Sequence, residues 1–261
     1  MTTLPFFQVD AFAEAPLTGN PAAVMPLQHW LDDAVMQAIA AENNLSETAF
    51  TVPSEDEDEA DFDLRWFTPT SEVDLCGHAS LAAGHVLIES APVRFSTRSG
   101  VLVVSRRDDL LELDLPAPPL TEVHEPELCR ALVVPDVPAW LAKGCNDAAI
   151  IQVEDEAAVR AVQPDFAALK RINRMAVVTA HGDRHDIVSR VFVPYLGIDE
   201  DPVTGSAHAA LAAYWAERLG RTEFTALQAS KRSGVLHCRL EGDRVVLGGH
   251  CQTVIVGQFQ L

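Results

Sequence analysis

Basic residues are scarce in this chain. It has 19 lysines and arginines against 38 aspartates and glutamates, so its formal net charge at pH 7 is −19. Nucleic acids and anionic membranes are themselves negatively charged, so a surface of this kind repels them. We therefore expect neither a nucleic-acid partner nor a membrane partner.

Cysteine is also sparse, and the spacing of the cysteines does not indicate a disulfide framework. The five cysteines are Cys76, Cys129, Cys145, Cys238 and Cys251, and no two of them form a C-x-x-C pair. An odd number of scattered cysteines is typical of reduced thiols in a cytoplasmic protein. We expect a cytoplasmic location and no disulfide bond.

Several sequence signatures are missing altogether. Residues 1–24 lack a basic start followed by an apolar core, which predicts no secretory signal, and no later run has the apolar length of a membrane span. The chain also lacks a Walker-type loop, a G-x-S-x-G elbow and a dinucleotide-binding glycine pattern in the required context. We expect no cofactor and no metal.

Short strand-like runs alternate with a few helices along the 261 residues. This pattern indicates an α+β fold built from barrels, since a doubly wound parallel sheet would need more crossover helices. In the first half we expect a helix at 31–43 and strands at 5–12, 48–52, 62–67, 101–105 and 110–115.

The proline-rich segment PAPPL, at 116–120, marks the best candidate for a domain boundary. We expect domains at 1–117 and 118–261, with a last strand near 252–260 that could return to the first domain. In the second half, ALVV at 131–134 is interpreted as a strand, and a helix is expected from Glu156 to Lys170.

An internal repeat joins the two halves. Residues 65–89 and 190–217 share an aromatic strand end, a proline two residues after a phenylalanine, an acidic loop and an alanine-rich helix. CGHA at 76–79 matches TGSA at 204–207 after a small insertion. Each half therefore supplies a strand, a turn and a helix start, as expected for a duplication.

Each predicted helix start is a candidate anion site. Free backbone N–H groups and the positive end of the helix dipole favour an anion, and Gly77 and Gly205 would let a ligand approach the backbone closely. These local donors outweigh the screened field of distant acidic residues. A small carboxylate substrate is the expected ligand.

Four motifs in order resemble the PhzF-like phenazine-biosynthesis isomerase family, which is related in fold to diaminopimelate epimerase and proline racemase. They are TGNPAAV (18–24), NNLSETAF (43–50), DLCGHAS (74–80) and DPVTGSAHAALA (201–212). The resemblance implies two similar domains, each an antiparallel β-barrel wrapped around a central helix, with the active site in the cleft between them. It also implies a homodimer.

The resemblance assigns roles to individual residues. Glu47 matches the acid/base carboxylate, and His78 and Asp201 match its polar partners. It implies an isomerase that moves a proton between carbons of a small carboxylate without a cofactor; the best-known member acts on a dihydro-hydroxyanthranilate. Without the resemblance, Glu47 reads as a surface glutamate, His78 as a buried structural histidine and Asp201 as a helix-opening residue.

The expected substrate-binding residues are Gly77, Gly205, Ser206, Cys76 and Asn20, the last at the rim of the site. Ser206 could both cap its helix and bind the ligand. Cys76 opens an alternative, because a thiolate at a helix start could serve an amino-acid racemase or epimerase. The matching position holds Thr204, which is a poor base. A third reading, from another class, is a non-catalytic protein that binds a small anion.

Overall fold

The chain divides into two compact units. A computed structural model describes residues 2–144 and 147–261. Unit 1 runs as far as Asp114 and includes Gly248–Leu261, and unit 2 comprises Leu115–Leu247. The division therefore falls just before the PAPPL segment, and the last strand lies in unit 1. Cys145 lies outside the described residues, and the other four cysteines are free thiols.

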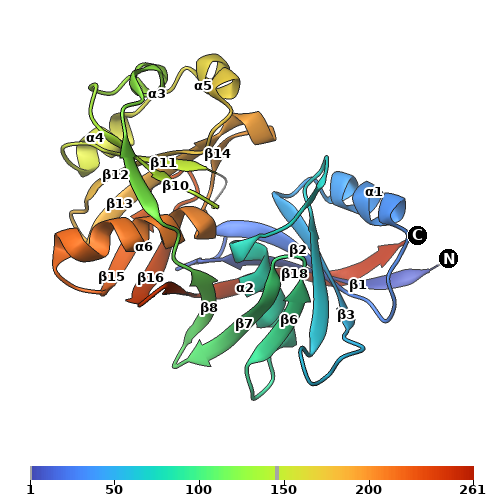
Figure 1. Ribbon diagram of the computed structural model, residues 1–261. Coiled ribbons are helices and arrows are strands. Elements are labelled where there is room, and N and C mark those ends of the chain that lie inside the picture. Colours follow the sequence, from blue (N-terminus) through green and yellow to red (C-terminus); the bar gives the residue numbers. More distant parts are fainter. Residues whose placement is uncertain (1, 145–146) are drawn as a thin grey trace. The chain divides into compact units, whose positions relative to one another are not determined.

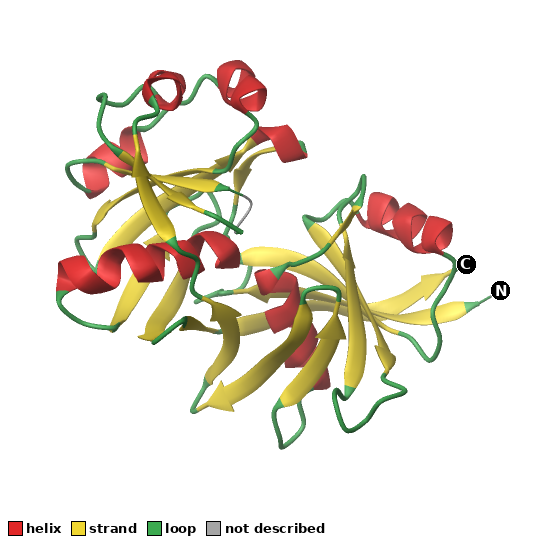
Figure 2. Ribbon diagram, viewed as in Figure 1, coloured by secondary structure: helices red, strands yellow, loops and turns green. Residues whose placement is uncertain are grey.

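Unit 1 wraps one mixed sheet around a helix (Figures 1 and 2). The strands pair in the order β18, β1, β2, β3, β4, β6, β7, β8. Its elements are β1 Thr3–Ala11, β2 Asn20–Pro26, α1 Asp33–Asn43, β3 Glu47–Pro53, β4 Phe62–Phe67, β5 Glu72–Val73, α2 Gly77–Leu87, β6 Val93–Thr97, β7 Gly100–Arg107, β8 Leu110–Pro116 and β18 Cys251–Gln260.

The family resemblance implied purely antiparallel strands, but the sheet of unit 1 is mixed. β2 and β3 are parallel, and so are β4 and β6. A parallel neighbour requires a crossover connection, and α1 and α2 are the helices that make these two crossovers. The closure of each sheet into a barrel stays a prediction.

α2 is buried along most of its length because its side chains are small. The residues from Gly77 to Gly84 are all buried. A Cβ atom at Gly84 would collide with the side chain of Val104 on β7. Alanine and glycine thus let this helix lie against strands on several sides. α1 instead packs only one face, through Met36 and Ile39, onto the outer side of the sheet.

Unit 2 has helices on both sides of its strands (Figure 1). Ile151 and Val178 point into the core under α3, α4 and α5, whereas the next residues, Gln152 and Thr179, bond to side chains of α6. The elements are β9 Leu120–Val123, α3 Pro126–Leu132, β10 Ala139–Ala142, β11 Ala148–Gln152, α4 Glu156–Ala161, α5 Phe166–Ile172, β12 Ala176–His181, β13 Ile187–Val193, the 3₁₀ turn η1 Pro194–Leu196, β14 Ile198–Asp201, α6 Gly205–Leu219, β15 Glu223–Gln228, β16 Gly234–Glu241 and β17 Arg244–Gly249.

The connections of unit 1 recur in unit 2. β11 and β12 are parallel across α4 and α5, and β13 and β15 are parallel across α6. β4 pairs with both β5 and β6, and β13 likewise pairs with both β14 and β15. The repeat seen in the sequence is therefore a repeat of topology. Among the described residues, no helix has both the length and the apolar character that crossing a membrane would need.

The same ion pair closes the hairpin before each buried helix. Arg65 donates through Nε and Nη2 to the two carboxylate oxygens of Glu72, at 2.7 and 2.8 Å. Arg190 donates to the two carboxylate oxygens of Glu200 in the same way, at 2.7 and 2.9 Å. Such two-pronged pairs fix orientation as well as distance. We call these two pairs the hairpin clamps.

Each hairpin clamp also rests on an aromatic ring. The guanidinium of Arg65 lies 5.2 Å from the ring centroid of Phe67, and that of Arg190 lies 4.9 Å from that of Phe192. Gly77 and Gly205, the first residues of α2 and α6, each follow the glutamate of their clamp by five residues. The clamps thus set where each helix begins.

Two local predictions in the second half are wrong. The segment ALVV was expected to form a strand, but Ala131 and Leu132 end α3, and Val133 adopts a left-handed conformation (φ 58°) that stops the helix. The single helix expected from Glu156 to Lys170 is two helices, α4 and α5. Pro164 lies between them and cannot donate the backbone hydrogen bond that a continuous helix requires.

We expect Glu200→Gln to lower the free energy of unfolding by about 1–3 kcal/mol, because it removes the charge of a half-buried, doubly bonded partner of Arg190. Urea unfolding followed by circular dichroism would measure the loss. The matched control is Glu127→Gln in the same unit, whose 3.8 Å pair with Arg130 is solvent-exposed and should change stability by less than about 0.5 kcal/mol. Equal effects in both variants would contradict a structural role for the clamp.

Candidate functional site

Three residues that can carry protons meet at the start of α2. Glu47 is the first residue of β3, Cys76 is the N-cap of α2, and His78 is its second residue. The Nε2 atom of His78 lies 3.2 Å from Oε2 of Glu47, and its Nδ1 atom lies 3.5 Å from Sγ of Cys76. The imidazole ring therefore stands between a carboxylate and a thiol, all within unit 1.

Burial and neighbouring charge act on this cluster in opposite directions. The side chain of His78 is only 6% exposed. Burial by itself would lower the pKa of His78, but Cys76 and Glu47 raise that pKa well above its ordinary value. Burial, reinforced by Glu47, raises the pKa of the Cys76 thiol, and His78 offsets this only in part. The raised pKa of the Cys76 thiol does not favour a ready thiolate.

The contact between Glu47 and His78 leaves hydrogen-bonding capacity unused. Oε2 of Glu47 and Nε2 of His78 are buried and close, yet neither has an aligned hydrogen-bond partner among the described residues. Buried polar atoms in folded proteins are nearly always paired. Two such atoms side by side indicate a place where a ligand supplies the missing bonds.

The start of α2 has no side-chain cap. Cys76 has extended backbone geometry, and its side chain makes no capping hydrogen bond to the first turn. The first N–H groups of a helix have no partner within the helix and carry partial positive charge. Gly77, which follows Cys76, is buried. The N-terminus of α2 thus faces the same surroundings as the Glu47–His78 pair.

Unit 2 holds the remaining predicted residues at the start of α6. Thr204 is the N-cap, but its hydroxyl donates to Oδ2 of Asp201 rather than capping the helix. Asp201 ends β14, Gly205 begins α6 and is buried, and Ser206 is half-buried in the first turn. The structure brings Asp201, Gly205 and Ser206 together within one turn.

Gln228, at the end of β15, holds this turn in place and was not singled out from the sequence. It is fully buried. Its Oε1 atom accepts from the backbone N–H of Thr204 at 2.8 Å, and its Nε2 atom donates to the carbonyl of Asp201 at 2.7 Å. The available clue was a polar residue on the same alternating face of β15 as the buried Phe224 and Ala226.

Asn20 was expected at the rim of the site, and the structure corrects this. Asn20 is the first residue of β2 and has no exposed surface. Its Nδ2 atom lies 3.3 Å from Nδ1 of His78, and its Oδ1 atom accepts from Ser46 at 3.1 Å. It is buried because β2 lies between β1 and β3. Ser46, like Gln228, was not identified from the sequence.

The same three residues also have the chemistry of metal ligands. Within the described part of the chain, Glu47, Cys76 and His78 are the one grouping of three such donors close enough to hold an ion, with one ligand atom of each within 4.8 Å of the others. In the structure His78 presents one ring nitrogen to Cys76 and the other to Glu47. The absence of a metal stays a prediction.

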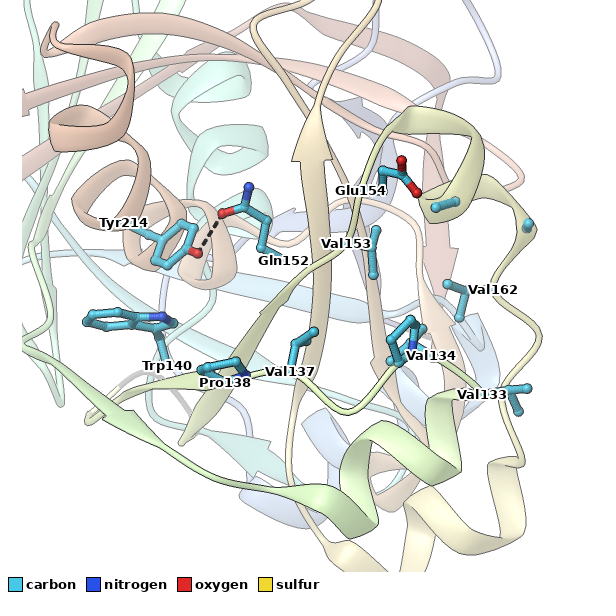
Figure 3. A pocket seen from close by; sticks show the side chains of 13 residues that line it. Val133, Val134, Val137, Pro138, Trp140, Gln152, Val153, Glu154, Val162 and Tyr214 are labelled. Atoms are coloured by element: carbon cyan, nitrogen blue, oxygen red, sulfur yellow. Dashed lines mark hydrogen bonds between the residues drawn. The ribbon is translucent and has the colours of Figure 1, made fainter.

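A pocket in unit 2 contains none of the predicted residues (Figure 3). It has a volume of about 670 Å³ and is lined mostly by apolar side chains such as Val137 and Trp140. Tyr214 donates to Oε1 of Gln152 at its edge. Its carboxylate, Glu154, is exposed and has no acid/base partner in the lining. The lining of this pocket therefore offers no pair like that of Glu47 and His78.

Solved structures of other proteins share this fold. A hydroxyproline epimerase from Agrobacterium vitis matches with a TM-score of 0.66 at 13% identity, covering 98% of this chain and 92% of its own. A PhzF-family phenazine biosynthesis protein from Enterococcus faecalis matches with a TM-score of 0.91 at 43% identity, over 100% of both chains. The first likeness concerns the fold alone, and the second concerns the sequence as well.

The chain belongs to the family of phenazine biosynthesis-like proteins, whose sequence pattern it matches over residues 9–257. An uncharacterized isomerase of Pseudomonas aeruginosa is 51% identical over 99% of both chains. Another from Halalkalibacterium halodurans is 41% identical over 100% of both. The protein is thus an enzyme of the isomerase type.

We expect His208, the fourth residue of α6, to make the protein less stable below pH 6.5. Burial lowers the pKa of His208 to about 4 from an ordinary value of 6.5. Between pH 4 and pH 6.5, His208 binds a proton in the unfolded chain but not in the folded chain. Stability that is complete above pH 6.5 is therefore lost as the pH falls, by about 3 kcal/mol at pH 4.

His208→Asn would test this loss, because an asparagine amide can still donate to the carbonyl of Thr204, as Nδ1 of His208 does at 2.8 Å. Urea unfolding from pH 7 to pH 4 should show a shallower decline of stability in the variant than in the wild type. Parallel declines would contradict the assignment.

Proposed function

We propose that this protein is a cofactor-independent isomerase that moves a proton between two carbons of a small carboxylate. The observation that carries the proposal is the Glu47–His78 pair, in which a carboxylate and an imidazole lie 3.2 Å apart with unused hydrogen-bonding capacity. General acid/base catalysis needs such a group within hydrogen-bonding reach of the transferred proton.

Glu47 is the group that exchanges the proton with carbon. Its carboxylate removes a proton from one carbon of the substrate, which breaks the C–H bond and leaves the electron pair delocalised over the substrate. The resulting carboxylic acid returns the proton to another carbon, so Glu47 ends in its starting state. His78, beside the same oxygen, stabilises the carboxylate through its N–H and favours return of the proton to the substrate.

The helix starts supply binding. The N-terminus of α2 at Gly77 can hold a substrate carboxylate beside Glu47. Gly205 and Ser206 offer an equivalent donor set at the start of α6, and Asp201 can bind a substrate amine. In this scheme Asp201 is kept in position by Thr204 and Gln228.

A racemase that uses Cys76 is the less favoured alternative. Burial raises the pKa of this thiol, so it would be a slow base at neutral pH. The matching residue in the second half is Thr204, whose hydroxyl is already engaged with Asp201. A non-catalytic anion-binding protein would not need the Glu47–His78 pair. The cytoplasmic location, the homodimer and the absence of a cofactor stay predictions.

Glu47→Gln should abolish proton exchange with carbon, reducing its rate by about 100-fold or more, because the amide cannot act as a base. The assay is proton NMR in D₂O with a panel of amino acids and other small carboxylates, including dihydro-hydroxyanthranilate. Deuterium uptake or rearrangement is expected with the wild type and with Cys76→Ser, but not with Glu47→Gln.

Two results would oppose the proposal. Exchange at an amino-acid α-carbon that disappears with Cys76→Ser and persists with Glu47→Gln would favour the racemase. Tight binding of a carboxylate by calorimetry, with no exchange by the wild type on any member of the panel, would favour the binding protein.

A further inference from the structure

β18 is the last strand in the pairing order of unit 1, and its sequence does nothing to protect its outer edge. On its other edge it pairs with β1 (Figure 1). Natural edge strands are usually blocked by charged side chains or proline, because their free backbone groups would otherwise pair with another chain. Residues 251–260 contain no charged residue and no proline, in a chain of which 22% is charged. This edge is therefore suited to pairing.

The hydrogen bonds to β1 determine which backbone groups of β18 face outward. The N–H and C=O groups of Leu261 bond to Thr2, each at 2.9 Å. In an antiparallel pair, successive residues alternate between bonding to the neighbouring strand and pointing away from it. The register with β1 is regular back to Ile255, so every second residue from Leu261 to Ile255 bonds to β1. The residues between them point their backbone groups outward: Val256, Gln258 and Gln260.

These outward groups are accessible and have no partner in the chain. Val256 is 70% exposed, and Gln258 and Gln260 are exposed as well. Within the described ranges, no hydrogen bond reaches the backbone of these three residues from the outer side. A backbone N–H or C=O group without a protein partner bonds to water or to another chain.

The spacing of the three residues is self-complementary. If a second copy lies antiparallel with its Gln258 opposite Gln258, then Val256 of each copy faces Gln260 of the other. Each facing pair can exchange two backbone bonds, which gives about six hydrogen bonds between the copies. A two-fold axis at Gln258 generates all of them, as the interface of a symmetric dimer requires.

The same pairing would cover exposed apolar side chains. A groove of about 370 Å³ between α1 and β18 is lined by Phe259 and Leu261, and Ile255 lies on this same face because side chains alternate along a strand. In the paired arrangement Leu261 of one copy lies opposite Ile255 of the other. These side chains are 44% and 47% exposed in the single chain. Large apolar side chains gathered on one exposed strand indicate an interface.

We propose that two copies of this chain associate through the outer edges of β18, antiparallel about Gln258, so that their sheets join into one. A second copy suits this edge better than a charged partner does, because residues 251–260 are neutral although the whole chain carries a formal charge of −19. The joined strands themselves bring no like charges together. The sequence predicted a homodimer without an interface, and this inference supplies the surface and the register. It does not depend on the proposed function.

Sedimentation of Gln258→Lys and Gln258→Glu tests the interface. Each variant places two like charges opposite each other at the axis, so the dissociation constant of the dimer should rise by about 10-fold or more. Mixing the two variants should restore the dimer, because a lysine then faces a glutamate. Val101→Lys is the matched control, since Val101 is 37% exposed on β7, which pairs with β6 and β8. It should leave the dimer unchanged.

Hydrogen exchange measured by NMR tests the register in the wild-type protein. In the dimer, the amides of Val256, Gln258 and Gln260 gain partners, so they should exchange at least about 10-fold more slowly in concentrated than in dilute protein. The amides of Gly257 and Phe259 bond to β1 in either state and serve as internal controls. This measurement needs no variant, so it stands even if a substitution disturbs folding.

The proposal is overturned if the wild type sediments as a monomer at every concentration. A dimer that Gln258→Lys does not weaken would place the interface on another surface and would also overturn it. If the mixture of the two charged variants fails to pair, or if the three amides exchange at the same rate at all concentrations, the register about Gln258 is wrong. None of these outcomes bears on the isomerase assay.

Discussion

A bidentate ion pair between neighbouring strands is the constraint on which the rest of the structure depends. Arg65 and Glu72 lock one hairpin, and Arg190 and Glu200 lock the other. Each clamp fixes the short loop that leads into a helix packed among strands. Neither N-cap side chain caps the first N–H groups of the helix that follows. The result is two helix starts whose first N–H groups have no side-chain cap.

The two units share this scaffold, but the pKa of the buried histidine in the central helix differs between them. In α2, Ser80 donates to the carbonyl of the N-cap Cys76 at 2.6 Å, and in α6 His208 makes the same bond to Thr204. His208 has only uncharged partners, so burial lowers its pKa. His78 has Glu47 beside it and holds its proton more tightly. The duplicated fold therefore holds a buried histidine with a raised pKa in one half and a buried histidine with a lowered pKa in the other.

Much of the architecture could be predicted because its signals are local. The alanine-rich segments after Gly77 and Gly205 form helices, and a strand that ends in an aromatic residue precedes each of them, as the repeat predicts. The errors have equally physical causes. ALVV has the composition of a strand, yet tertiary packing of Leu132 in the core draws it into α3. The mixed direction of the strands could not be predicted from composition, because parallel pairing depends on the crossover helices.

What the sequence by itself determined is the repeat, the two helix starts and the residue types gathered there. What only the tertiary structure decided is how those residues meet. The contact between Asn20 and His78 spans 58 positions of the chain, and it exists because β2 and β3 pair in parallel and lie against α2. Hydrogen bonds of this kind have directions and partners that composition and spacing do not encode, so the orientation and charge of His78 follow from packing alone.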